Sequence, residues 1–208
     1  MDSQTDGKDV TVKNWIVRYY DKKDKLTGTT IQTVKEIKTT GNGFEWTIGT
    51  VSKDAKGKEI SAGDLSMSCE DGIFKMDMRN FIDEETMKSF EGMEVTMDAT
   101  ELDYPAVLVP GQALPDGHIT VKVTSQGMPI MTMVVKICDR KVEAIEDMTT
   151  PAGTFSCYKM TSTIETKTMF TVVAKSTDWM AKKVGSVRSE TFDKNGNLTG
   201  YSVLTSMK

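Results

Sequence analysis

The sequence has no apolar run long enough to cross a bilayer as a helix. Its longest apolar stretches, such as residues 106–109, are only a few residues long, whereas a spanning helix needs roughly 20. A membrane-spanning helical protein is therefore excluded. Residues 1–10 are polar and lack the apolar centre of a signal peptide, and we expect them to be disordered. Two explanations stay open: a cytosolic protein, or an exported one whose leader is absent from this chain.

Cysteine and histidine are scarce. Cys69, Cys138 and Cys157 include no C-x-x-C pair, which excludes the usual structural zinc patterns and the thioredoxin motif. Their redox state stays open, because a bridge between the second and third is conceivable in an oxidising compartment. The single histidine, His118, has no recognised nucleophile near it in the sequence, and catalytic zinc sites usually take two or three histidines. We therefore expect no catalytic residue, no metal and no cofactor.

Two further motifs, a calcium loop and a phosphate loop, are incomplete in this sequence. Asp193, Asn195 and Asn197 imitate the opening of a calcium loop, but Leu198 and Leu204 stand where that loop needs glycine and glutamate. The glycines of residues 41–43 lack the lysine and the following helix of a phosphate loop. An enzyme is therefore not expected, and a hydrolase ranks third among the functions considered.

Acidic residues are concentrated in one region. The chain carries a net charge of −4, and residues 64–103 hold twelve Asp or Glu against three Lys or Arg. A surface of that sign repels phosphate groups, so neither nucleic acid nor anionic lipid is expected to bind through this region. The region is either a solvated face or a docking surface for a basic partner.

The chain is rich in short alternating runs bounded by turn residues. Such runs at regular spacing are typical of an antiparallel β-protein. In residues 118–125, Ile119, Val121 and Val123 alternate with polar residues, which predicts one buried and one solvated face. Asn195-Gly196 is the strongest two-residue hairpin signal. The predicted strands are residues 12–20, 29–39, 44–48, 65–69, 118–125, 129–137, 141–148, 154–164, 167–175, 184–193 and 198–206.

One short helix is predicted at about residues 82–91. Asp83 suits the N-cap, two glutamates follow it in the first turn, and Gly92 is placed to end the helix. Met87 and Phe90 lie three residues apart on one face. Because so short a helix is marginal alone, we expect that face to pack on a sheet. The predicted fold is mainly β: an antiparallel barrel-like or strongly curved sheet of about a dozen strands with this helix.

The stretch 103–117 contains three of the five prolines. Each proline removes a backbone donor, so an extended connection is favoured over a central strand. The stretch separates a half of net charge −7 from a half of net charge +3. We expect a single β-rich domain over residues 11–208, with a division at this connection as the alternative.

Methionine is unusually common, with 15 residues, many of them on predicted strand faces. Flexible thioethers either fill a core that is poor in leucine and phenylalanine or line a deformable cavity for an apolar ligand. For the second case, the candidate ligand-binding residues are Met131, Met133, Tyr158, Met169 and Trp179. Copper bound by thioethers is a remote third case, because no Met cluster with His or Cys is visible.

The C-terminal half resembles a known family. The block from Arg140 to Lys159, Trp179, the run 184–188 and the connection 109–117 are similar to exported β-rich proteins of Gram-negative envelopes, many of them candidate lipoproteins of unknown function. The resemblance covers about residues 103–208. It implies a curved or barrel-like antiparallel sheet, a periplasmic or outer-membrane-associated location, and no established activity. It also implies that a lipidated leader, not present in this chain, could tether the protein to a membrane.

Together these observations favour a non-enzymatic envelope protein. Its expected partner is an apolar or lipid-like ligand in a barrel or half-barrel cavity. The alternative is a structural or assembly protein of the envelope that acts through protein contacts, for example through residues 64–103.

Overall fold

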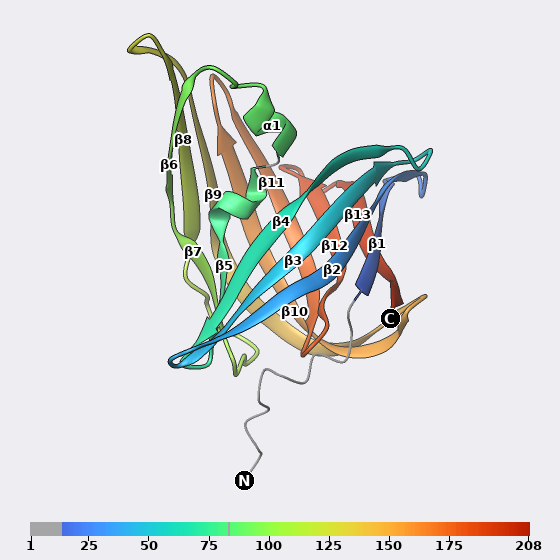
Figure 1. Ribbon diagram of the computed structural model, residues 1–208. Helices are drawn as coiled ribbons and strands as arrows, with labels where there is room; N and C mark the ends of the chain where they lie inside the picture. The colour runs from blue at the N-terminus through green and yellow to red at the C-terminus, as the bar shows by residue number, and fades with distance from the viewer. Residues whose placement is uncertain (1–13, 83) are drawn as a thin grey trace.

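The computed structural model describes residues 14–82 and 84–208. Thirteen antiparallel strands form one continuous sheet that curls into a nearly closed barrel (Figure 1), so the expected fold class is confirmed. The strands are β1 Asn14–Asp21, β2 Leu26–Thr40, β3 Gly43–Asp54, β4 Glu59–Glu70, β5 Ile73–Asp77, β6 Glu94–Ala99, β7 Glu101–Pro105, β8 Gly117–Ser125, β9 Met128–Thr150, β10 Gly153–Lys167, β11 Thr171–Ala181, β12 Gly185–Asp193 and β13 Leu198–Met207.

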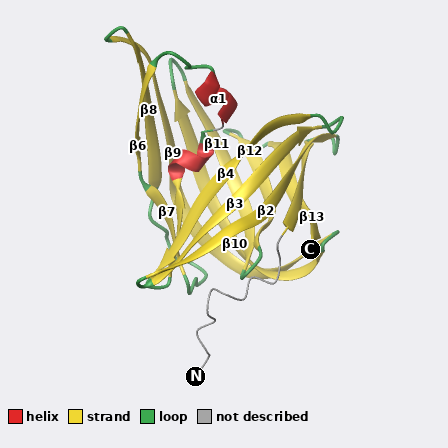
Figure 2. Ribbon diagram, viewed as in Figure 1, coloured by secondary structure: helices red, strands yellow, loops and turns green. Residues whose placement is uncertain are grey.

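Helical structure among the described residues is limited to the 3₁₀ helix η1, Met78–Phe81, and the α-helix α1, Glu84–Lys88. Both lie between β5 and β6 in the chain, on one side of the barrel (Figure 2). The helix is shorter than the predicted 82–91, and its expected N-cap, Asp83, lies outside the described residues. Phe90 packs on the core as expected. No helix in the described part of the chain is long and apolar enough to span a bilayer.

Alternation along the strands builds the core. Ile119, Val121 and Val123 are fully buried on one face of β8, as predicted, while Lys122 is exposed. They pack with Met78 and Leu102. This cluster also receives partly buried side chains from β5, β6, β7 and β9: Met76, Val95, Met97, Ala99, Tyr104, Met131, Met133 and Val135. Methionine therefore contributes to this core from η1, β5, β6 and β9.

A single stretch of chain closes the barrel. β6 pairs only with β8, β7 pairs only with β5, and Thr100 joins the two strands. The Thr100 N–H donates to the His118 carbonyl at 2.9 Å, and the Thr100 carbonyl accepts from the Met78 N–H at 3.2 Å. The Thr100 hydroxyl accepts from the His118 N–H at 2.8 Å. The closing stretch therefore changes partner at its midpoint, and the closure is staggered between the two halves of the barrel.

The proline-rich connection is held against the sheet. After β7, residues 106–116 run beside β9, where the Gly111 N–H donates to Val142 at 2.7 Å and the Leu114 N–H donates to Arg140 at 2.9 Å. Leu108 and Leu114 pack on Val142 and Met160. An extended connection is thus what the structure contains. The segment expected to be disordered, residues 1–10, lies outside the described residues.

β9 is one strand of 23 residues, so the prediction of two separate strands over 129–137 and 141–148 was wrong. Asp139 adopts a positive φ of 53°, and the register against β10 shifts between Thr161 and Thr163. A β-bulge absorbs this charged position without ending the strand. The strand can therefore bend sharply and extend to both ends of the barrel (Figure 1).

Three hairpin turns share one local design. The side chains of Asp21, Asp54 and Asp193 each accept N–H bonds, at 2.8–3.1 Å, from the second and fourth residues after them. Asp193 pairs with Asn197 in the backbone, and Gly196 has a φ of 84°. The hairpin predicted at Asn195-Gly196 is confirmed, but its loop contains three residues instead of two. A left-handed glycine after a tight turn produces this geometry.

Candidate functional site

An apolar groove of about 550 Å³ lies where the β9–β10 hairpin meets the turn between β11 and β12. Its volume falls in the range typical of ligand pockets. β9 contributes one lining residue, β10 contributes five, and the end of β11 with its turn contributes three. The lining residues are Ile145, Thr154, Phe155, Ser156, Cys157, Tyr158, Ala181, Lys182 and Val184.

Strand register brings the apolar side chains of the groove together. Tyr158 lies directly opposite Ile145 on β9, and Cys157 lies directly opposite Ala181 on β11. Directly opposed residues have their Cβ atoms about 5 Å apart and contact one another. The turn that follows β11 brings Val184 back, because its N–H donates to the Ala181 carbonyl at 3.2 Å. The groove is therefore formed by side chains from three neighbouring strands and one turn.

Cys157 is buried within this site. Its thiol donates to the Phe155 carbonyl at 3.4 Å. Burial raises the pKa of Cys157, so the sulfur remains a protonated thiol at neutral pH. A nucleophilic cysteine needs the opposite shift. Cys157 therefore serves as an apolar packing residue.

Lys182 provides the positive charge of the groove. Its Nζ lies 5.9 Å from the centre of the Tyr158 ring, within the range of a cation–π contact. Lys182 belongs to none of the ion pairs found among the described residues. The groove thus combines apolar walls with one cation that no carboxylate neutralises.

Trp179 packs behind the groove. It is 6% exposed and packs with Cys157, Ala181 and Val187. Its Nε1–H donates to Glu146 Oε1 at 2.6 Å, and Lys159 Nζ lies 3.4 Å from the same oxygen. The hydrogen bond from Trp179 lowers the pKa of Glu146, with Lys159 adding to the effect. This network fixes the indole ring, which supports the wall of the groove.

The residues predicted to line a cavity lie in three separate places. Tyr158 lines the groove, and Trp179 packs directly behind it. Met131 and Met133 lie opposite Val123 and Val121 and pack on the core beneath β8. Met169 is 90% exposed in the turn between β10 and β11. Alternation identifies the face of a strand but not the position along it, so residues of one face can be far apart.

Sequence reasoning missed Ile145, Phe155, Lys182 and Val184 as groove residues. A usable signal was present in Pro151 and Gly153, which are residue types typical of a turn. Counting outward from Thr150 paired with Gly153 places Ile145 opposite Tyr158. The register beside Val184 depends on a bulge in β12, where Val187 is the extra residue opposite Trp179 and Met180, and the sequence gives no signal for it.

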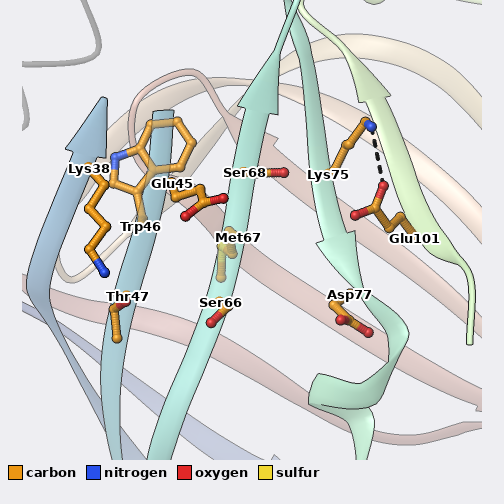
Figure 3. Close-up of a pocket in the computed structure, with 10 residues that line it drawn as sticks. All are labelled: Lys38, Glu45, Trp46, Thr47, Ser66, Met67, Ser68, Lys75, Asp77 and Glu101. Atoms are coloured by element: carbon orange, nitrogen blue, oxygen red, sulfur yellow. Dashed lines mark ion pairs between the residues drawn. The ribbon is translucent and has the colours of Figure 1, made fainter. Parts of the chain in front are cut away.

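A second concavity, of about 180 Å³, lies over β3, β4 and β5 (Figure 3). Its polar groups are largely occupied by one another: Lys75 Nζ lies 3.3 Å from Glu101 Oε2 and 3.5 Å from Glu70 Oε2. The hydrogen bond to Glu101 raises the pKa of Lys75. A small site with internally paired charges is poorly suited to an apolar ligand.

A polar centre lies where the proline-rich connection meets the sheet. Arg140 is 5% exposed and donates to the carbonyls of Pro115 and Asp103. Its guanidinium lies 4.5 Å from the centre of the Tyr104 ring. Both ends of the connection are therefore fixed by one buried side chain. Burial raises the pKa of the nearby Asp178 carboxyl, which accepts from Ser176 at 2.5 Å.

The geometry around the histidine is unlike a catalytic site. His118 has a side chain that is 42% exposed, and its Nε2 lies 4.0 Å from Asp98 Oδ2. Within residues 14–82 and 84–208, no cluster of three or more His, Cys, Asp or Glu could hold a metal ion.

The barrel fold is shared with two solved structures. A candidate exported protein with a YmcC-like fold from Bacteroides fragilis is 26% identical, with a TM-score of 0.76, and the alignment covers 94% of this chain and 95% of that one. A candidate lipoprotein from Parabacteroides distasonis is also 26% identical, with a TM-score of 0.76 and 95% of each chain covered. No curated protein matches the chain.

The fold class is thus that of these barrel proteins. The DUF3108-like family model matches residues 11–204. The chain belongs to the DUF3108-like family, and the resemblance to a family of exported proteins of unknown function is confirmed.

Proposed function

We propose that the protein is a non-enzymatic binding protein of the cell envelope that holds an apolar or lipid-like ligand in the β9–β11 groove. One observation carries the proposal: Ile145 is 53% exposed, lies directly opposite Tyr158, and lines the groove with it. Covering ~100 Å² of such apolar surface contributes about 2.5 kcal/mol. A ligand with an alkyl chain would bury this surface.

The charge of Lys182 indicates which class of apolar ligand the groove prefers. Lys182 lies at the Tyr158 side of the groove without a carboxylate partner among the described residues. An amphiphile with an anionic head would place its chain on Ile145 and its head near Lys182. Fatty acids and anionic lipids have this chemistry.

The envelope location is supported by the two related structures, since one is described as an exported protein and the other as a lipoprotein. For this chain we propose a periplasmic or outer-membrane-associated location. Binding is favoured over catalysis because the thiol in the groove is protonated and His118 lies on another strand.

The alternative function, assembly through the acidic residues 64–103, is supported less well. Several of these acids are engaged within the protein: Asp64 binds Lys35, Asp77 binds Arg79, and Glu70 and Glu101 share Lys75. Neutralisation by neighbouring lysines and arginines weakens the attraction that a basic partner would feel.

The groove is tested with Ile145→Asp and a fluorescent fatty acid kept below its micelle concentration. We expect binding to weaken about tenfold or more, because a charge replaces apolar contact area. Ile60→Asp is the matched control, since Ile60 is 55% exposed on β4 and should bind as the unmodified protein does. Equal binding by the two variants, or no binding by the unmodified protein, would refute the proposal.

A further inference from the structure

Large exposed apolar side chains gather at one end of the barrel. Because the sheet is antiparallel, five hairpins have their turns at the same end of the barrel, the upper end in Figure 1: β1–β2, β3–β4, β8–β9, β10–β11 and β12–β13. We call this end the rim. Twelve large hydrophobic residues are exposed in the described chain, and seven of them lie at the rim: Ile60, Met93, Met128, Ile130, Met169, Phe170 and Val172.

The most exposed of these residues lie on two neighbouring hairpins. Met169 and Phe170 are 90% and 77% exposed in the β10–β11 turn. Lys167 pairs with Val134 on β9, so this turn lies beside β9 a few residues below the exposed Met128 and Ile130. A contiguous exposed patch of this kind on a protein marks an interaction surface.

Lysines are concentrated in the turns of the rim, most of them on the β1–β2 and β3–β4 hairpins. The turns at residues 21–25, 53–59, 125–130, 167–171 and 193–197 carry eight lysines and five acids, a net charge of +3, while the whole chain carries −4. All but one of these lysines are exposed. Asp21, Asp54 and Asp193 direct carboxylate oxygens into the amides of their own turns, so the lysine side chains form the outer surface.

We infer that the rim docks on an anionic lipid bilayer, with the β10–β11 and β8–β9 tips inserted among the headgroups. Apolar tips on the same rim as lysine-bearing turns match an interface whose headgroups are negative and whose interior is apolar. Amphipathic lysine stems can extend along the apolar boundary while their charges reach phosphate. The proposed ligand groove lies at the opposite end, between the β9–β10 and β11–β12 turns, so the inference does not depend on it.

Two acidic residues at the start of β6 orient the docked molecule. Glu91 lies just before β6, and Glu94, its first residue, pairs with Thr124 beside the β8–β9 tip. Anionic headgroups repel them, so the barrel should tilt toward the β10–β11, β12–β13 and β1–β2 hairpins, and the β10–β11 tip should insert more deeply than the β8–β9 tip. Those hairpins are consecutive along the sheet, which gives a continuous contact sector.

The test is co-flotation of the full chain with vesicles of phosphatidylcholine alone or mixed with phosphatidylglycerol. We expect binding to the mixed vesicles and weak binding to the neutral ones. The double variant Met169→Glu, Phe170→Glu should lose about tenfold or more of the affinity. Val107→Glu is the control, because Val107 is 70% exposed between β7 and β8 at the opposite end of the barrel and does not line the groove; it should bind as the unmodified protein does. Lys23→Glu should weaken binding to mixed vesicles about fivefold or more without changing binding to neutral ones.

A second measurement reports insertion directly. Phe170→Trp should give tryptophan emission that brominated lipids quench, whereas the same change at Val107 should give no added quenching. Absence of flotation by the unmodified protein overturns the inference, as does equal flotation by the double variant. If the vesicles do not bind and the double variant instead changes the oligomeric state in size-exclusion chromatography, the rim contacts protein and the lipid inference is wrong.

Discussion

The hydrogen bond between Trp179 and Glu146 couples protonation of the carboxylate to the position of the indole ring, which packs behind the groove. The indole N–H donates to the carboxylate at 2.6 Å, and the bond lowers the pKa of Glu146. A group with a lowered folded pKa stabilises the fold above its unfolded pKa, and the contribution is lost as pH falls through the folded value. The packing of Trp179 behind the groove should therefore loosen at acid pH, while the rest of the barrel stays folded.

We predict that Glu146→Gln removes an acid-dependent change in tryptophan near-ultraviolet circular dichroism. The unmodified protein should lose this signal as pH falls below the ordinary glutamate range, because the protonated carboxyl holds the indole less firmly. Glu143→Gln is the matched control, since its pKa is lowered by Lys141 and Thr161 without contact to tryptophan. An unchanged titration in the Glu146 variant would contradict the assignment.

Lys182 is expected to determine preference for a charged head. We predict that Lys182→Gln weakens the binding of a fatty acid about threefold to fivefold, because a surface charge contributes modestly. The binding of the alcohol with the same chain should not change. Competition binding of the two ligands at low and high salt measures the difference. Equal losses for acid and alcohol would assign Lys182 a packing role only.

At the scale of elements, one buried arginine holds the proline-rich connection. Arg140 donates to Pro115 and Asp103 and lies over Tyr104. We predict that Arg140→Met destabilises the protein by about 2–4 kcal/mol, because two buried carbonyls lose their partner. Urea denaturation measures the loss, and proteolysis should become faster within residues 106–116. The exposed neighbour Lys141→Met should shift stability by no more than about 0.5 kcal/mol, and a similar loss there would contradict the role of Arg140.

Sequence patterns predicted elements well wherever alternation was regular and turns were marked. β8 and β13 follow this rule, and so does the Asp193 turn. β5 and β6 were missed because they are short and lie in the acidic stretch, where a run such as Glu94–Ala99 offers only three apolar positions. β9 was divided because Asp139 and Arg140 look like a turn, while the bulge and the buried contact of Arg140 appear only in three dimensions.

The candidate groove was predictable in part. Tyr158 was identified from its amphipathic ring and strand face. Ile145 was missed because its position depends on pairing across the β9–β10 turn, and Val184 because the register beside it depends on a bulge in β12. Met169 shows the converse: an apolar residue two positions beyond a strand end can be on the surface. Tertiary register, which local pattern does not encode, accounts for these differences.

At the scale of the whole molecule, the staggered closure is the weakest part of the sheet. Each half of residues 94–105 has a strand partner on one side only, whereas β10 has partners on both sides over most of its length. We predict that amides of 94–105 exchange with deuterium earlier than those of 157–165, because local opening needs fewer bonds broken. Peptide-resolved exchange mass spectrometry measures this order. Equal protection would mean that the barrel opens only as a whole.

The pairing of β1 with β13 has a consequence for the order of folding. The Asn14 and Lys208 backbones exchange hydrogen bonds at 2.9 and 3.0 Å, so the first described strand meets one neighbour from the far end of the chain. During synthesis or export, β1 can pair with β2 early, but its other edge stays open until β13 emerges. Such long-range pairing slows folding and leaves an edge exposed to other chains. A helper that shields strand edges would therefore be needed most just before the last residues are released.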